Sequence, residues 1–175
     1  MSVLIWRILG TIGGYIDCCI DSHGSNAAKR LPTRKSAMII SVDYVSRNYA
    51  ISLESSGNIA VISIKGPLDV PPQLAAFGRL LQLEFLDVRS PEEVWAFNRK
   101  HAEEIMDFVA SLHAEANEYH CIVHCKAGIS RSAAIALYVA TATGCPFPRR
   151  EQAGGANPLM LRILCELSGL TIAQK

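Results

Sequence analysis

The chain has 175 residues, of which half are hydrophobic and 19% are charged, and its net charge is +1. This composition predicts one globular domain with a sizeable core, excludes a disordered chain, and gives no reason to expect a nucleic-acid partner. Six cysteines in a chain of this length fit a reducing compartment better than a disulfide framework. We therefore expect a cytoplasmic protein.

Residues 1–35 are expected to form an N-terminal extension whose role the sequence does not define. Residues 3–20 are mostly apolar, but Arg7, Asp17 and three glycines interrupt them. The stretch therefore fits neither a transmembrane helix nor a signal peptide well. A loosely packed extension is the favoured interpretation, and membrane contact through this segment is the weaker alternative. The folded domain is expected to span residues 36–175.

Apolar, β-branched runs predict strands at Ala37–Val42, Ile59–Ile64, Leu81–Leu86 and Tyr119–Val123. Asp43 is expected to cap a short helix over residues 44–55, and the proline-rich residues 67–77 are expected to form a surface loop.

Three further helices are predicted. Ser90, Pro91 and Glu93 form a capping box, which predicts a helix from Pro91 to about Glu115. Its expected buried stripe is Val94, Trp95, Ala102, Ile105, Met106, Val109 and Leu112. The Ala-rich run Ser132–Thr143 should end at Gly144, and Asn157 should cap a last helix that starts at Pro158. The pattern predicts an α/β fold, in which a central, mostly parallel sheet of four to five strands is flanked by helices on both faces.

The most informative stretch is the loop between Tyr119–Val123 and the helix that follows it. Cys125 and Arg131 both lie on this loop. Backbone N–H groups and the positive end of a helix converge at such a position, which makes an anion cradle. The same environment lowers the pKa of a thiol, so that Cys125 would be a nucleophilic thiolate. The planar fork of Arg131 matches two phosphate oxygens, Gly128 leaves room for the anion, and Ser132 can hydrogen-bond the sulfur.

The string HCKAGISRS, His124–Ser132, resembles the signature H-C-x-x-G-x-x-R-[ST] of the cysteine-dependent protein tyrosine and dual-specificity phosphatases. It is closest to compact bacterial tyrosine-phosphatase-like proteins. The resemblance implies the cysteine phosphatase fold and hydrolysis of phosphate monoesters through a cysteinyl-phosphate intermediate, with no metal or organic cofactor. A monomer acting on a phosphorylated protein or a small phosphoester is expected.

The resemblance also assigns roles to residues. Cys125 would be the nucleophile, Ser132 would assist its departure, and His124 would hold the loop by hydrogen-bonding its backbone. Asn157 would steady the same loop, although a plain helix cap explains it equally well. The phosphate would be bound by the Arg131 side chain and by the loop amides of Lys126, Ala127, Gly128, Ile129, Ser130 and Arg131.

Asp87 is the expected general acid. It follows a predicted strand and precedes a predicted helix, which in a parallel sheet places it at the same edge as Cys125. A carboxylic acid there could protonate the leaving oxygen and later accept a proton from water. Asp69 and Glu92 are competing candidates, and Glu84 is less suitable because it lies inside a strand.

Several alternatives remain open from the sequence. Lys126 directly after the nucleophile is shared with some phosphoinositide and phosphatidylglycerophosphate phosphatases, so an anionic lipid is a second substrate class. A catalytically silent phosphate-binding module is a third interpretation, and a rhodanese-like persulfide transferase is a more distant one. A metal site at His120, Cys121, His124 and Cys125 is disfavoured, because residues four apart on a strand are separated by about 13 Å.

Overall fold

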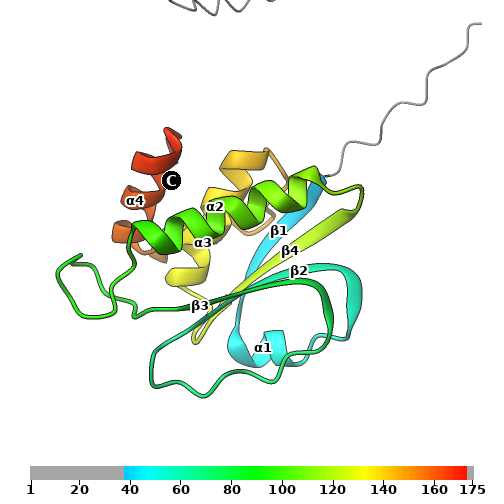
Figure 1. Cartoon of the computed structure of the whole chain (residues 1–175), viewed down its shortest axis with the longest axis horizontal. Helices are drawn as coiled ribbons and strands as arrows, with labels where there is room; N and C mark the ends of the chain where they lie inside the picture. Colours follow the sequence, from blue (N-terminus) through cyan, green and yellow to red (C-terminus); the bar gives the residue numbers. More distant parts are fainter. Residues whose placement is uncertain (1–37, 173–175) are drawn as a thin grey trace, which may run out of the picture. The chain divides into compact units, whose positions relative to one another are not determined.

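The computed structural model describes residues 38–172, and the expectations for residues 1–37 lie outside this range. In the described part of the chain, four parallel strands form one sheet in the order β1–β4–β2–β3 (Figure 1). The strands are β1 (Met38–Ser46), β2 (Ser56–Lys65), β3 (Phe77–Glu84) and β4 (Glu118–Cys125). The predicted α/β class with a parallel sheet is confirmed.

The sequence predicts helices on both faces of the sheet, and the observed helices are distributed unevenly. They are α1 (Arg47–Ile51), α2 (Arg99–Ala114), α3 (Arg131–Thr143) and α4 (Pro158–Ser168), with a 3₁₀ helix at Arg150–Gly155. The three longer helices, α2, α3 and α4, gather on one side, and the short α1 lies away from them (Figure 1). The expectation of helices on both faces is therefore wrong for α2, α3 and α4, which are not divided between the two faces.

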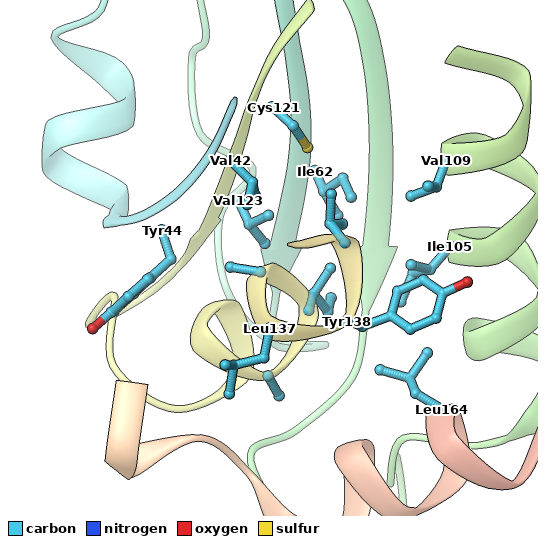
Figure 2. Packing of buried hydrophobic residues seen from close by; sticks show 14 of the residues in the cluster. Val42, Tyr44, Ile62, Ile105, Val109, Cys121, Val123, Leu137, Tyr138 and Leu164 are labelled. Atoms are coloured by element: carbon cyan, nitrogen blue, oxygen red, sulfur yellow. The ribbon is translucent and has the colours of Figure 1, made fainter. Parts of the chain in front are cut away.

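A single core explains this arrangement. Every second residue of β4, and every second residue of β2 from Ala60 to Ile64, belongs to one buried cluster, so one face of the sheet is buried in it. The same cluster takes its remaining residues mainly from α2, α3 and α4. Figure 2 shows this packing, with strand residues Val42, Ile62, Cys121 and Val123 facing helix residues Ile105, Val109, Leu137, Tyr138 and Leu164.

Two early elements have different boundaries from those predicted. Strand β1 continues to Ser46, so Asp43 lies inside the strand and caps no helix. The cap of α1 is Ser46, whose hydroxyl accepts a hydrogen bond from the N–H of Tyr49 at 3.3 Å. Strand β3 begins at Phe77 and ends at Glu84, earlier at both ends than predicted. Gly78 and Arg79 near its start interrupt the apolar pattern on which the prediction rested.

The helix predicted from Pro91 to Glu115 begins only at Arg99. Its cap is Asn98, which forms a capping box with His101. The Ser90 hydroxyl instead donates to the Glu92 carboxylate, so the predicted capping box does not form.

Burial explains why the helix starts late. The ring of Phe97 is buried against Phe85, with 5.1 Å between the ring centroids, and this contact fixes the chain just before Asn98. Val94 and Trp95 are consequently exposed and do not belong to the helix. The buried face of α2 consists of Ala102, Ile105, Phe108, Val109 and Leu112.

The elements after α2 follow the prediction. Strand β4 leads into α3, which ends at Gly144 in the left-handed conformation. Helix α4 begins at Pro158 with Asn157 as its cap and ends at Gly169. None of the helices among residues 38–172 is long and apolar enough to cross a membrane.

Candidate active site

The candidate site is at the edge where the parallel strands end. Strand β4 lies between β1 and β2 and finishes at Cys125. The next residues form the cradle loop, residues 125–131, and α3 begins directly at Arg131. Ligands bind at this edge in open parallel sheets because loops and helix N-termini converge there.

Gly128 allows the cradle loop to pack directly on the end of β1. Its φ is 69°, a backbone conformation that is unfavourable for residues other than glycine. A Cβ atom at this position would lie 2.3 Å from the backbone N of Ser46 and 2.4 Å from the carbonyl C of Val45. The expected reason for this glycine, room for the anion, is therefore replaced by an observed one, contact with β1.

The Cys125 sulfur is surrounded by hydrogen-bond donors. Its Sγ lies 3.2 Å from the Ser132 hydroxyl oxygen and accepts from the Gly128 N–H at 3.3 Å. Burial alone would raise the pKa of the thiol. The Ser132 hydroxyl and the backbone N–H groups of Ser132, Ile129 and Gly128 outweigh burial and hold the pKa of Cys125 below its usual value. These donors thus stabilise the thiolate of Cys125 more than an ordinary cysteine environment does.

Arg131 is buried, and part of its guanidinium has no hydrogen-bond partner among the described residues. One nitrogen, Nη1, donates to the backbone carbonyl of Phe85 at 2.8 Å, which fixes the side chain. Its Nε is buried and has no hydrogen-bond partner among the described residues. Buried donors are nearly always paired, so this one calls for an acceptor. Nε therefore has free capacity for an acceptor.

Asp87 is joined to the cradle loop. Its Oδ1 accepts from the Ser130 hydroxyl at 2.8 Å and from the side-chain amide of Asn157 at 2.8 Å. Both donors bind Oδ1, which leaves Oδ2 open to a further partner. The Ser130 hydroxyl donates to Asp87 and makes no capping hydrogen bond to α3, whose first N–H groups lack a side-chain cap.

Asn157 has two functions in the same place. Its Oδ1 accepts from the N–H groups of Leu159 and Met160, which is the helix cap that the sequence predicts. Its Nδ2 donates to Asp87 and to the Val88 carbonyl, and its backbone N–H donates to the Ser130 carbonyl at 3.2 Å. Asn157 therefore ties α4, the cradle loop and Asp87 together.

The competing carboxylates are in less suitable environments. Asp69 accepts from the Gly66 N–H, and this bond, with the nearby charges of Arg47, Lys126 and Arg131, lowers the pKa of its carboxyl against the effect of burial. Its oxygens lie 3.3 Å from Arg47 and 3.7 Å from Lys126. This lowered pKa and the two ion pairs make Asp69 a weaker candidate for a proton donor.

The other two carboxylates are held by neighbouring side chains. The Ser90 hydroxyl lowers the pKa of the exposed Glu92, and Glu84 is paired with Lys65. Neither has the hydrogen bond to the cradle loop that Asp87 has.

His124 does not make the hydrogen bond that we expected. Its ring is fully buried, and neither nitrogen has a partner that meets hydrogen-bond geometry within the described residues. Burial first, and then the positive charge of Arg47, lower the pKa of His124 to about 4 against a smaller opposite effect of the Cys125 backbone. His124 is therefore a neutral, buried side chain at the end of β4, directly before the cradle loop.

A cavity of about 530 Å³ opens beside the cradle loop. Lys126, Arg131 and Asp87 line it together with apolar side chains, among them Leu68, Leu86 and Trp95. The sequence interpretation missed Arg47, whose backbone N–H donates to the Lys126 carbonyl, and the Phe85 carbonyl that holds Arg131. Both contacts join segments that are distant in sequence, so no local sequence pattern predicts them.

Among residues 38–172, no group of three or more His, Cys, Asp or Glu side chains is placed to hold a metal ion. The site therefore consists of a thiol, a guanidinium, backbone amides and a carboxylate, drawn from β4, α3 and the loop after β3. No protein-family model, no curated protein and no solved structure matches the chain.

Proposed function

We propose that this protein hydrolyses phosphate monoesters through a cysteinyl-phosphate intermediate, as a protein tyrosine or dual-specificity phosphatase does. The observation that supports this most strongly is the surroundings of the Cys125 sulfur. Three backbone N–H groups and the Ser132 hydroxyl favour its thiolate, and a buried guanidinium nitrogen without a partner lies on Arg131 of the same loop. A thiolate beside donors with free capacity suits a reaction at phosphorus.

In the first step, the Cys125 thiolate attacks phosphorus while the bond from phosphorus to the ester oxygen breaks. The Arg131 Nε and the loop amides bind the phosphoryl oxygens, whose charge they stabilise. Asp87 transfers a proton from Oδ2 to the departing oxygen, and the alcohol or phenol leaves. Ser130 and Asn157 position Asp87 for this transfer.

In the second step, water attacks phosphorus and the P–S bond breaks. The Asp87 carboxylate takes the proton that water loses, which restores the acid for the next cycle. The Ser132 hydroxyl, 3.2 Å from Sγ, donates to the sulfur and stabilises the departing thiolate. Inorganic phosphate then leaves.

The surroundings of the cradle favour a phosphate carried on a side chain such as tyrosine. Cys125 is 2% exposed, so the phosphorus must reach a sulfur that is almost covered. The cavity presents Asp69, Glu84 and Asp87 against Lys126 and Arg131, and Lys126 is already near Asp69. This surplus of carboxylates opposes a headgroup with several phosphates, so the phosphoinositide alternative is less favoured.

We also place the reaction in the cytoplasm. The cysteines of the described residues, Cys121, Cys125, Cys145 and Cys165, are free. A thiolate nucleophile stays active only where thiols remain reduced, which the cytoplasm provides.

Replacement of the nucleophile tests the proposal. Cys125→Ser should abolish turnover of p-nitrophenyl phosphate and of a phosphotyrosine peptide, and the far-UV circular dichroism spectrum should stay unchanged. Rapid acid quench of the parent enzyme with labelled substrate should trap a phosphorylated cysteine. Cys165→Ser, at a half-buried position of α4, is the matched control and should retain activity. Turnover by Cys125→Ser equal to that of the parent would refute the proposal.

A further inference from the structure

One wall of the cavity beside the cradle loop is apolar and exposed. Leu68, Leu86 and Trp95 line it and are 100%, 40% and 55% exposed. They come from two different segments, the loop after β2 and the acid loop, which we define as residues 86–97 after β3. Large exposed apolar side chains that gather at one cavity mark a binding surface. The phosphate-binding groups alone do not account for them.

Trp95, in this wall, has an unfavourable backbone conformation. Its φ is 62°, and no other non-glycine residue among residues 38–172 has a positive φ. For a bulky aromatic residue this conformation costs free energy, and such costs concentrate at functional positions. Glycine or asparagine would avoid this cost, so a tryptophan here indicates a use for the ring.

The neighbours of Trp95 maintain that conformation. The Leu86 N–H donates to the Trp95 carbonyl at 2.8 Å, which closes the acid loop at its base. Directly after Trp95, Ala96 and Phe97 are 7% and 1% exposed, so the chain is anchored in the core. The same closure places Asp87 and Trp95 on the wall of one cavity.

We propose that Trp95 is a specificity-determining residue that holds the aromatic ring of the substrate against Leu68 and Leu86. This inference rests on the proposed function, because it places the phosphate of the same substrate in the cradle. The ring of an aryl phosphate packs against the indole in this arrangement, and an alkyl phosphate makes no such contact. Trp95 thus selects the group that carries the phosphate.

Calorimetric binding to the full chain carrying Cys125→Ser separates the two parts of the site. Phenyl phosphate and methyl phosphate have the same charged group and differ in the ring. Trp95→Ala should weaken phenyl phosphate binding about tenfold, and methyl phosphate binding should change less than about twofold. Trp95→Phe should retain most of the affinity for phenyl phosphate. In the active enzyme, Trp95→Ala should raise KM for aryl phosphates with little change in kcat.

Val94→Ala is the matched control, because Val94 is 75% exposed on the same loop and does not line the cavity. It should change neither affinity. Equal weakening of both esters by Trp95→Ala would overturn the inference, since Trp95 would then only shape the loop. Unchanged binding of phenyl phosphate would overturn it as well. If the Cys125→Ser parent binds neither ester, the proposed function itself fails, and the role of Trp95 fails with it.

Discussion

The cradle loop and the acid loop meet at one site but are stabilised in different ways. The cradle loop connects the buried end of β4 to α3, which is buried from Arg131 to Ala140. Its glycine packs on the backbone of β1 without room for a methyl group. The acid loop has no regular secondary structure and exposes Asp87, Val94 and Trp95. Hydrogen bonds at Leu86 and Asp87 hold it in place.

This difference separates folding from chemistry. A substitution in or beneath the cradle loop changes the packing of the sheet, so it should affect both stability and activity. A substitution at an exposed position of the acid loop removes few buried contacts, so it should affect the reaction and leave the fold intact. The same reasoning predicts that specificity can change through the acid loop at small cost in stability.

The largest expected effect comes from the acid loop. Asp87→Asn keeps the size of the side chain but removes the proton donor, so kcat for a substrate with a poor leaving group should fall about 10²- to 10³-fold. For p-nitrophenyl phosphate, whose leaving group needs little protonation, the loss should be much smaller. Steady-state kinetics over a series of aryl phosphates of rising leaving-group pKa measures this dependence.

Glu92→Gln, an exposed carboxylate in the same loop, is the control and should leave the series unchanged. An equal loss across all leaving groups in Asp87→Asn would assign the acid to another residue. The unfolding midpoint in urea should move little in either variant, which tests whether the acid loop contributes to chemistry alone.

The sequence predicted the elements whose signals are local. The apolar run before Cys125, the Ala-rich run up to Gly144 and the Asn157–Pro158 start of α4 all form as predicted. The helix predicted from Pro91 failed because burial of Phe97 against Phe85 overrides the local capping signal at Ser90. Asn98 carried a competing signal, since His101 three residues later completes its capping box.

The site was predictable to a similar degree. Cys125, Arg131, Ser132 and Asp87 come together at one edge of the sheet, because the ends of parallel strands meet there. The bonds that join Asp87 to Ser130 and to Asn157 link three segments that are distant in sequence. The burial of His124 without a partner depends on residues packed from several elements, so spacing alone could not reveal it.

A pH dependence of stability should come from His124, which is buried at the end of β4. The pKa of His124 is about 4 in the folded state and 6.5 ordinarily, so below pH 6.5 the unfolded chain binds the additional proton. The contribution of neutral His124 to stability is complete above pH 6.5 and is lost as the pH falls toward 4. The loss amounts to about 3 kcal/mol of unfolding free energy. Urea unfolding at a series of pH values measures the loss.

The loss should be absent from His124→Asn, which does not titrate, and present in His120→Asn, which alters the exposed histidine of the same strand. Subtracting the unfolding free energy of His124→Asn from that of the parent at each pH cancels the contribution of the carboxylates, which both proteins share. If both histidine variants lose stability in parallel with the parent, His124 is not neutral by burial, and the cradle loop is less tightly packed than its contacts indicate.

The smallest effect distinguishes the two possible starts of α2. The Asn98 side chain accepts from the His101 N–H at 3.3 Å, so Asn98→Ala should lower the unfolding free energy by about 1 kcal/mol. Ser90 makes no such bond to a helix, because its hydroxyl donates to Glu92, so Ser90→Ala should change stability by less than about 0.5 kcal/mol. Urea unfolding of the two variants beside the parent measures both values. The opposite ranking would mean that the helix begins at Pro91 in solution. Part of the acid loop would then be helical, so Trp95 would lose its strained conformation and Asp87 would lose its hydrogen bonds to Ser130 and Asn157. The start of α2 at Arg99, where Phe97 is buried and Asn98 caps the helix, therefore sets the length of the acid loop and the placement of both residues on which the proposed reaction and its specificity depend.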